Sequence, residues 1–365
     1  MISLGWFVFV TLIFALIQSE IYRRWGLSRL QYMRRFNKKA VFEGEDVELV
    51  ERIFNRKPLP LPWLRVESKM HPELEFGSQE NLDIKHEQYH KSLFSLMPYT
   101  GITRRHKVKC KKRGFYRLRS AALTSGELFG VQEVSRTYYF DTELIVYPKI
   151  LPIDEVPLPS HSWQGDVTIR RWIVDDPFII SGVREYNYGD PLNKINWKAT
   201  ARVGSFQVHN TDFTAQPNIL IYLNVDISES MWEAVTDTER IEKGIQYAAS
   251  IADFAISKGM DVGFGTNAYI KDGEESPIRI RPSKGEGQLL YILEVLAKLE
   301  VARSVTFYTF LETDIQTGLT GADIIIMTCF ISERMQDQIR LLRDRGNAVE
   351  VILLTEEGDI EGVVI

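Results

Sequence analysis

Three oxygen-bearing side chains stand at alternate positions in the stretch DISES, residues 226–230, directly after the apolar run NILIYLNV. Asp226, Ser228 and Ser230 could together coordinate one hard cation such as Mg²⁺, which prefers oxygen ligands. Ser228 or Ser230 could instead accept hydrogen bonds from the first backbone N–H groups of a following helix. The two roles do not exclude each other, and we favour the helix cap.

A second pattern that could do chemistry is HEQYH, residues 86–90. In an HExxH motif two histidines, one helical turn apart, bind zinc, and the glutamate activates a water molecule. Such a zinc hydrolase needs a firm helix and a third ligand, whereas this segment lies among strand-like sequence in a chain with six histidines. We therefore expect surface histidines here and rank the zinc hydrolase last.

Other catalytic signatures are weak or missing in the sequence. KGEGQ, residues 284–288, could bind an anion at the start of a helix, but a plain helix-start loop is the simpler interpretation. The chain contains neither a GxxxxGK[ST] phosphate loop nor a GxSxG nucleophile elbow. We expect no enzymatic activity.

The most distinctive segment is GVREYNYGDPLNKINWKATARVGSFQVH, residues 182–209. It combines a turn at 187–191 with large apolar residues and charges of both signs. The segment could be an interdomain staple of buried aromatic residues and ion pairs, or a surface that binds a partner. Both interpretations stay open, and they concern Arg184, Glu185, Tyr186, Gly189, Asp190, Ile195, Trp197, Lys198, Arg202 and Phe206.

The elements around DISES predict an α/β domain over residues 218–365. Apolar strands alternate with amphipathic helices, which indicates a mainly parallel sheet covered on both faces, with its site at the carboxyl edge of the strands. DISES follows the first strand and lies at such an edge. The expected strands are 218–226, 260–267, 323–330 and 348–355, and the expected helices are 239–259, 285–300 and 332–346.

Upstream of this domain the sequence predicts an all-β domain and a connecting segment. Residues 41–150 contain short runs of alternating apolar and polar residues, broken by Gly, Pro and Asn. This pattern is typical of an antiparallel β-sandwich, for which an immunoglobulin-like fold is one candidate. Residues 151–217 are less regular and rich in Pro, Trp, Arg and Asp, so we interpret them as a structured connection.

The N-terminus has the features of an uncleaved membrane anchor over residues 1–22. Sixteen consecutive residues, ISLGWFVFVTLIFALI, carry no charge, and about twenty residues span a bilayer core. Seven basic residues and no acidic one follow in the segment 23–40, which could contact anionic lipid headgroups. By the positive-inside rule, this single-pass protein would keep the bulk of the chain in the cytoplasm.

Length and composition agree with this organisation. A chain of 365 residues suggests two or three domains, and a net charge of −5 argues against a nucleic-acid partner. The two cysteines, Cys110 and Cys329, offer no disulfide framework and fit a reducing compartment.

The series Arg184-Glu185-Tyr186, Gly189-Asp190, Ile195, Trp197-Lys198-Ala199 and Ala201-Arg202 resembles the signature of domain-of-unknown-function family 58, which precedes a von Willebrand factor A-like domain. The stretches 111–130 and 143–148 and the anchor followed by a sandwich also resemble this family, so the resemblance covers nearly the whole chain. Many members have two membrane helices, whereas this sequence predicts one. The resemblance implies a Rossmann-like A domain at residues 218–365.

The resemblance also implies function. Members look like membrane-anchored adaptors that accompany MoxR-type AAA+ ATPases and other A-domain proteins in assembly or cell-envelope processes. We therefore expect a non-enzymatic scaffold with protein partners, and as the alternative a Mg²⁺-dependent adhesion module.

In A domains of that type, DxSxS, a loop threonine and a later aspartate hold Mg²⁺, and a partner carboxylate completes its shell. Asp226, Ser228 and Ser230 match the first motif, but Cys329 stands at the aspartate position and Ser283 is a poor substitute for the threonine. Because a thiol is a soft ligand, the resemblance implies an incomplete metal site.

Overall fold

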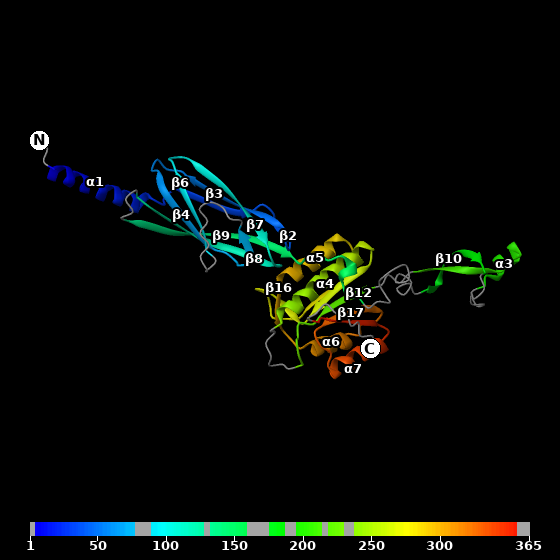
Figure 1. The fold of residues 1–365 in the computed structure, drawn as a ribbon. Helices are drawn as coiled ribbons and strands as arrows, with labels where there is room; N and C mark the ends of the chain where they lie inside the picture. Colours follow the sequence, from blue (N-terminus) through cyan, green and yellow to red (C-terminus); the bar gives the residue numbers. More distant parts are fainter. Residues whose placement is uncertain are drawn as a thin grey trace. The chain divides into compact units, whose positions relative to one another are not determined.

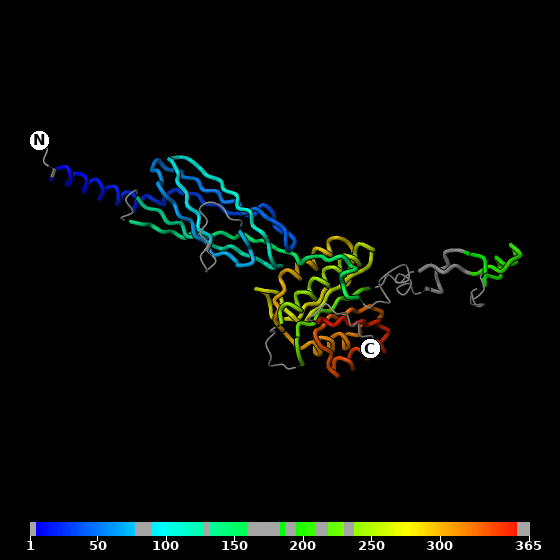
Figure 2. The backbone as a smooth tube through the Cα atoms, viewed as in Figure 1, coloured from blue at the N-terminus to red at the C-terminus, as the bar shows by residue number. Residues whose placement is uncertain are grey.

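The computed structural model of the chain describes residues 4–76, 89–127, 132–158, 175–186, 195–213, 218–229 and 237–355. The chain divides into two compact units, residues 1–149 and 150–365. Figures 1 and 2 show a helix and β-strands in the first unit, and helices with strands in the second. We describe each unit by itself.

Helix α1 (Leu4–Trp25) is the one described helix that is long and apolar enough to cross a membrane. Its span Gly5–Trp25 has a mean hydropathy of 1.6, and 11% of the most apolar window is buried. Most of its large apolar side chains are exposed, so the helix does not lie in the core of the described structure. This candidate membrane span lies near the N-terminus, and its length and composition are sufficient to cross a bilayer.

The carboxyl end of α1 is joined to the β-strands of the first unit. The Tyr22 hydroxyl donates to the carbonyl oxygen of Pro60 at 3.0 Å. Lys57 Nζ donates to two carbonyl oxygens in the turn after the helix, that of Gly26 at 2.6 Å and that of Ser28 at 3.2 Å. Since Gly26 and Ser28 lie just beyond the helix, these bonds hold the end of α1 and the following turn against residues 57–60.

The segment 23–40, expected to be a basic juxtamembrane stretch, has a different structure. Helix α1 continues to Trp25, and β1 (Leu30–Phe36) and β2 (Ala40–Phe42) follow as parts of the β-sheets. The physical reason lies in the register of β1, which places Arg34 directly opposite Glu51 of β3. Arg34 is 3% exposed and pairs with that carboxylate, so its charge belongs to the core and does not contact lipid.

The rest of the first unit is a two-layered β-structure, which confirms the prediction of a β-rich region. One sheet has the order β1-β3-β7-β5 and the other the order β2-β9-β8-β4-β6. Apolar side chains from both sheets share one core, for example Leu49 of β3 and Leu144 of β9. The remaining strands are β3 (Asp46–Asn55), β4 (Leu61–Lys69), β5 (Leu74–Phe76), β6 (Tyr89–Leu96), β7 (Gly101–Cys110), β8 (Gly114–Gly126) and β9 (Glu133–Tyr147).

The second unit contains a five-stranded sheet of order β15-β13-β12-β17-β18, which we call sheet D. Strands β12, β13, β17 and β18 are parallel, and β15 pairs antiparallel to β13 at one edge. The predicted α/β pattern is therefore confirmed. The strands are β12 (Asn218–Leu223), β13 (Asp261–Thr266), β15 (Ile278–Ser283), β17 (Ala322–Thr328) and β18 (Ala348–Leu353).

Helices cover both faces of sheet D because its central strands are apolar on both sides. Leu220 and Tyr222 of β12 share a core with α6 and α7. Leu223 points to the opposite face, where a side chain at Gly244 of α4 would meet it at 2.8 Å. The helices are α4 (Thr238–Ser257), α5 (Glu286–Lys298), α6 (Phe307–Gln316) and α7 (Glu333–Asp344).

Three smaller elements complete the second unit. A 3-10 helix, η1 (Ile153–Glu155), follows the boundary between the units. Strands β14 (Ala268–Ile270) and β16 (Leu299–Arg303) form an antiparallel pair beside sheet D that the sequence did not predict. The connecting segment contains β10 (Asp175–Glu185) and β11 (Gln207–Phe213), which pair antiparallel, and helix α3 (Trp197–Val203) between them.

Candidate functional site

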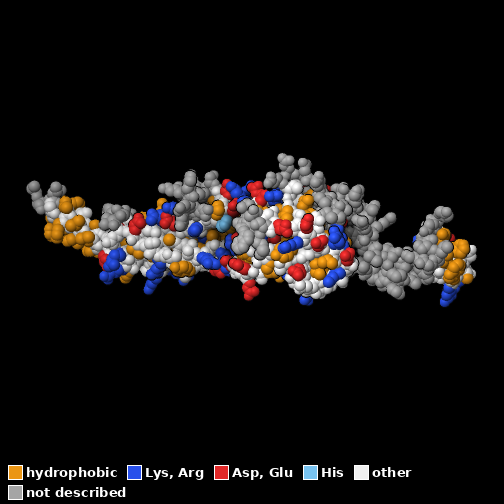
Figure 3. Space-filling model, turned by 90° about the horizontal axis from the view of Figure 1, so that it is seen from below, with side chains coloured by type: hydrophobic (Ala, Val, Ile, Leu, Met, Phe, Trp, Pro, Cys, Tyr) orange, Lys and Arg blue, Asp and Glu red, His pale blue; other side chains and the backbone are white. Residues whose placement is uncertain are grey.

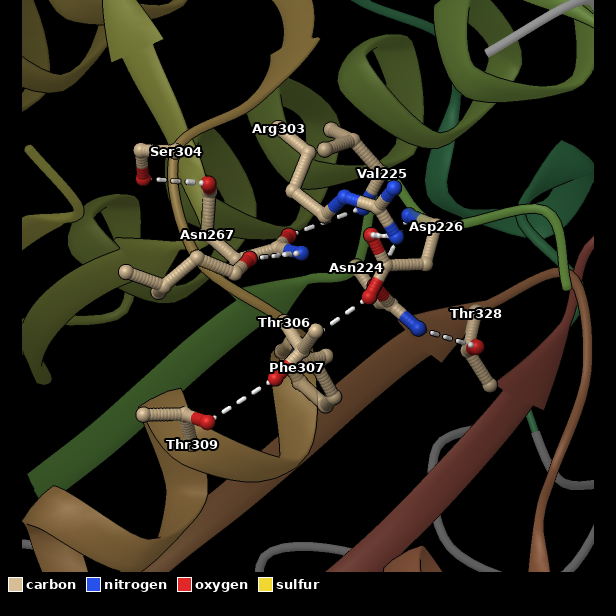
Figure 4. A network of polar contacts seen from close by, with 11 residues as sticks. Asn224, Val225, Asp226, Asn267, Arg303, Ser304, Thr306, Phe307, Thr309 and Thr328 are labelled. Atoms are coloured by element: carbon tan, nitrogen blue, oxygen red, sulfur yellow. Dashed lines mark hydrogen bonds and ion pairs between the residues drawn. The ribbon is translucent and has the colours of Figure 1, made fainter. Parts of the chain in front are cut away.

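The structure places Asp226 at the switch point of sheet D. Strand β12 lies at the centre, and the chain passes to β13 on one side and later to β17 on the other. In sheets of this kind ligands bind outside the carboxyl ends of the strands where the strand order reverses. Asn224, Val225 and Asp226 leave β12 at that point (Figure 4).

Asp226 is buried, and its carboxylate is held by neighbouring protein groups that include Phe307, Arg303 and Asn267. Oδ2 accepts a hydrogen bond from the backbone N–H of Phe307, the first residue of α6, at 2.9 Å. Oδ1 lies 3.5 Å from Nη1 of Arg303 (Figure 4). Burial raises the pKa of Asp226, and the Phe307 N–H and the Arg303 charge oppose that effect. The carboxylate therefore joins the end of β12 to the end of β16 and to the start of α6.

Buried amide side chains surround Asp226. Asn224 Nδ2 donates to Thr328 Oγ1 at 3.0 Å, which joins the ends of β12 and β17. Asn267 Oδ1 accepts from the N–H of Val225 at 3.0 Å, and its Nδ2 donates to the carbonyl oxygen of Val305 at 3.1 Å. These bonds hold the ends of three parallel strands and the start of α6 in a fixed arrangement (Figure 4).

The structure also tests the helix cap predicted for the serines of DISES. Ser228 is half-buried, and Ser230 lies outside the described part of the chain. The proposed cap is wrong for Ser228, because α4 begins at Thr238 and its cap is Asp237, whose side chain accepts from the N–H of Arg240 at 3.1 Å. Asp237 follows Ser228 by nine residues, too far for Ser228 to reach the first turn of this helix.

A threonine that the sequence did not reveal lies beside Asp226. Thr306 is the cap residue of α6, is 7% exposed, and precedes the residue whose N–H reaches Asp226. Its hydroxyl is hydrogen-bonded to that of Thr309 at 2.8 Å. The sequence signal was the spacing of Phe307, Phe310 and Leu311, which is typical of a short helix with one buried face.

The described residues at this edge do not fit Mg²⁺. The charge of Asp226 is paired with Arg303, and its other oxygen accepts the Phe307 N–H. Burial raises the pKa of Cys329 to about 11, so its thiol is protonated at neutral pH and supplies no charge. A neutral thiol and an already paired carboxylate are weak partners for a hard divalent ion.

The segment 182–209 is exposed at the positions that distinguish a surface from a staple. Arg184, Glu185, Lys198 and Arg202 are exposed, and Trp197 is 66% exposed. Tyr186 is half-buried and Ile195 is buried, while Gly189 and Asp190 lie outside the described residues. Within the described part of the segment, the exposed side chains form a short surface on β10, β11 and α3.

The described part of HEQYH does not form a zinc helix. His90 lies on strand β6 and is 3% exposed, on the same face as Ser92, Phe94 and Leu96; residues 86–88 lie outside the described part of the chain. Arg34 Nη2 approaches His90 Nδ1 at 3.4 Å. Burial, together with the positive charge of Arg34, lowers the pKa of His90 to about 3. The expectation of a surface histidine is also wrong at this position, because the strand alternation turns His90 inward.

The loop KGEGQ leads into helix α5, as expected of a plain helix-start loop. Gly285 precedes α5 with a φ of 95°, in the left-handed region that favours glycine, and the first helical residue is Glu286. A carboxylate in the first turn competes with an external anion for this helix end.

Comparisons with known proteins find a family model that matches part of the chain, including both candidate sites. Residues 182–360 match the family described as "Protein of unknown function DUF58". The matched range begins just before Arg184 and includes α3 and sheet D.

Among curated proteins, this chain is similar to "Uncharacterized protein YeaD" of Bacillus subtilis (strain 168). It is 20% identical over 355 residues, which are 97% of this chain and 83% of that protein.

Solved structures similar to this chain include the ASH / PapD-like domain of human CEP192, at 14% identity and a TM-score of 0.24, covering 33% of this chain and 87% of that domain. A non-cellulosomal cohesin from Archaeoglobus fulgidus has 10% identity and a TM-score of 0.24, covering 32% and 91% of the two chains. A CARDB domain from Pyrococcus furiosus has 14% identity and a TM-score of 0.22, covering 33% and 96%.

Proposed function

We propose that this protein is a membrane-anchored scaffold or adaptor that binds protein partners through one exposed patch. The observation that carries the proposal is the exposure of four large apolar side chains on a short segment. We call this surface the signature patch; with their exposed fractions, its apolar members are Val183 (44%), Trp197 (66%), Val203 (64%) and Phe206 (55%), and its basic members are Arg184, Lys198 and Arg202.

The signature patch has the composition of a binding surface. Trp197 and Phe206 contact each other edge to face, with ring centroids 6.4 Å apart, yet both stay more than half exposed. Figure 3 shows hydrophobic side chains gathered over this segment beside a basic side chain, and a second gathering over α1. Exposed apolar groups with aromatic and arginine side chains are enriched where proteins bind each other.

The charge of the signature patch indicates the chemistry of the partner. Among its described residues, Arg184, Lys198 and Arg202 are basic and Glu185 is acidic, in a chain whose net charge is −5. Glu185 Oε1 accepts a hydrogen bond from Ser205 Oγ at 3.4 Å within the segment. We therefore propose a partner that presents an apolar pocket with an acidic rim.

The remaining parts of the proposal rest on α1 and on sheet D. Helix α1 would anchor the protein in the cell membrane, and the basic residues that follow it favour a cytoplasmic location for the bulk of the chain. The strand order of sheet D, with one antiparallel edge strand, supports a von Willebrand factor A-like domain. Such an adaptor would work with a MoxR-type AAA+ ATPase and with other A-domain proteins.

The experiment compares crosslinked partners of the full-length protein in its native membrane by quantitative mass spectrometry. Trp197→Ala should reduce recovery of the specific partners about tenfold or more, since truncation of a central aromatic anchor costs about 2 kcal/mol or more. Tyr291→Ala is the matched control, because Tyr291 lies on α5 and is 54% exposed.

Equal recovery of partners by both variants, or the absence of any protein specific to the wild type, would refute the proposal. Thermal unfolding of the purified variants checks that both keep the wild-type fold. A loss confined to Trp197→Ala then assigns the binding to the signature patch.

A further inference from the structure

We propose that the guanidinium of Arg303 is the built-in cation of the Asp226 site, so that this edge of sheet D works without a divalent metal. The oxygen ligands of DISES suggest a metal site, whereas the structure pairs Asp226 with Arg303 and with the N–H of Phe307. It is independent of the partner-binding role of the signature patch.

The backbone of Arg303 is held in register with the strand ends around Asp226. Arg303 is the last residue of β16 and pairs with Ala268 of β14. The next residue, Ser304, donates from its N–H at 2.9 Å and from its hydroxyl at 2.6 Å to the carbonyl oxygen of Asn267. Asn267 in turn accepts from Val225, which directly precedes Asp226. The position of Arg303 beside Asp226 is therefore fixed by the fold.

The two charged groups are largely shielded from water. The side chain of Asp226 is 5% exposed and that of Arg303 is 19% exposed, with 3.5 Å between Oδ1 and Nη1. A carboxylate in such a place needs a positive partner to stay ionised. Arginine suits this role because it keeps its proton at every pH that a cell experiences.

A divalent ion would meet two obstacles at Asp226. To bind Oδ1 directly it would have to stand within about 2 Å of that oxygen, close to the guanidinium, and like charges repel strongly in a shielded site. To bind Oδ2 it would have to compete with the N–H of Phe307 for an oxygen that satisfies the start of α6. Cys329 stands after β17 with a thiol and supplies no second negative charge there. The charges of Asp226 and Arg303 cancel, so this pair offers no net negative charge that attracts a metal.

The test uses the full-length protein in detergent or nanodiscs and measures Mn²⁺ binding by electron paramagnetic resonance and thermal unfolding with and without Mg²⁺. The wild type should show neither specific Mn²⁺ binding nor a metal-dependent shift at millimolar concentrations. Arg303→Gln should gain Mn²⁺ binding at least about tenfold tighter than the wild type, because the repelling charge is removed. It should also gain a rise in unfolding temperature of about 2–4 °C at saturating metal.

Two variants make the result specific. Arg303→Lys keeps the positive charge and should remain insensitive to metal, which also shows that the site tolerates substitution. Asp226→Asn added to Arg303→Gln should abolish the gained binding. Arg340→Gln is the control for loss of a surface arginine, since Arg340 on α7 has a side chain that is 73% exposed.

Specific Mn²⁺ binding by the wild type would overturn the proposal and favour a metal-dependent adhesion module. A folded Arg303→Gln protein that binds no more Mn²⁺ than the Arg340→Gln control would also overturn it. Because no partner protein is used, neither outcome bears on the signature patch.

Discussion

Replacing Glu51 by glutamine should destabilise the β-structure of the first unit more than any surface change on the same strand. Glu51 is fully buried in β3, and its carboxylate is shared by three side chains. Arg34 Nε lies 3.3 Å from Oε1, His106 Nε2 lies 3.0 Å from Oε2, and the Tyr32 hydroxyl donates to Oε1 at 2.9 Å. The substitution Glu51→Gln removes the negative charge and leaves the guanidinium of Arg34 buried without it.

Two lines of reasoning give the same magnitude for this change. Breaking a buried ion pair by removing one partner costs about 3–5 kcal/mol. Burial raises the pKa of Glu51, but the hydrogen bond from His106 and the charge of Arg34 outweigh it and lower the pKa from 4.5 to about 2. That difference corresponds to about 3 kcal/mol at neutral pH. Because the folded-state pKa is the lower one, this stability is present above pH 4.5 and is lost as the pH falls towards 2.

The assay is hydrogen exchange by mass spectrometry on the full-length protein, which reports opening free energies for separate peptides. Peptides from β3 and β7 should lose about 3–5 kcal/mol of protection in Glu51→Gln, whereas peptides from sheet D serve as the internal reference. Glu48→Gln is the matched control on the same strand; its side chain is 44% exposed and lies 3.7 Å from Arg105. The control should change protection by at most about 1 kcal/mol. If Glu51→Gln behaves like the control, the network does not hold this core together.

Three further changes test other parts of the structure. Burial and Arg34 lower the pKa of His90 to about 3, so the folded protein excludes a proton that the unfolded chain takes up below pH 6.5. The free energy of unfolding should therefore fall by up to about 1.4 kcal/mol per pH unit of acidification. His90→Gln should lack that slope in a pH series of hydrogen exchange. Gly263→Ala would place Cβ 2.6 Å from the backbone of β15 and should cost about 1–3 kcal/mol in denaturant unfolding, whereas Gly287→Ala, with no neighbour within 4 Å of its Cβ, should be neutral or slightly stabilising. Asn267→Ala leaves the buried N–H of Val225 without its acceptor and should cost about 1–3 kcal/mol, and unchanged unfolding would contradict the bond.

Local patterns were sufficient to predict the elements of sheet D. The continuous apolar run of β12 and the amphipathic pattern of α4 are determined by neighbours within a few residues, and a glycine with positive φ follows both α4 and α7. In β3 the alternation also places Val47, Leu49 and Ile53 in the core. The same alternation put Glu51 in the inward series, which was a signal for a buried charge.

Pairings across long stretches of chain could not be predicted in the same way. Arg34 lies in a basic run and resembles a lipid-facing residue until the register of β1 and β3 places it opposite Glu51. Arg303 and Asp226 are 77 residues apart in the sequence and meet because β16 ends beside β12. The spacing of Phe307, Phe310 and Leu311 indicates the short helix α6, but it does not show that its cap residue Thr306 lies beside Asp226.

These pairings change which residues offer free energy for binding. His90 and Asp226, which suggested chemistry, and the buried Glu51 make their interactions inside the protein, with Arg34, His106, Arg303 and the start of α6. A group already satisfied within the fold gains little from an external ligand, because binding would first have to break its internal bonds. Trp197 and Phe206 are in the opposite state, since most of their surface is exposed to solvent. Burying that surface against a partner is favourable at about 25 cal/mol per Å². The exposed surface around α3 therefore offers more free energy for binding a partner than the carboxyl edge of sheet D.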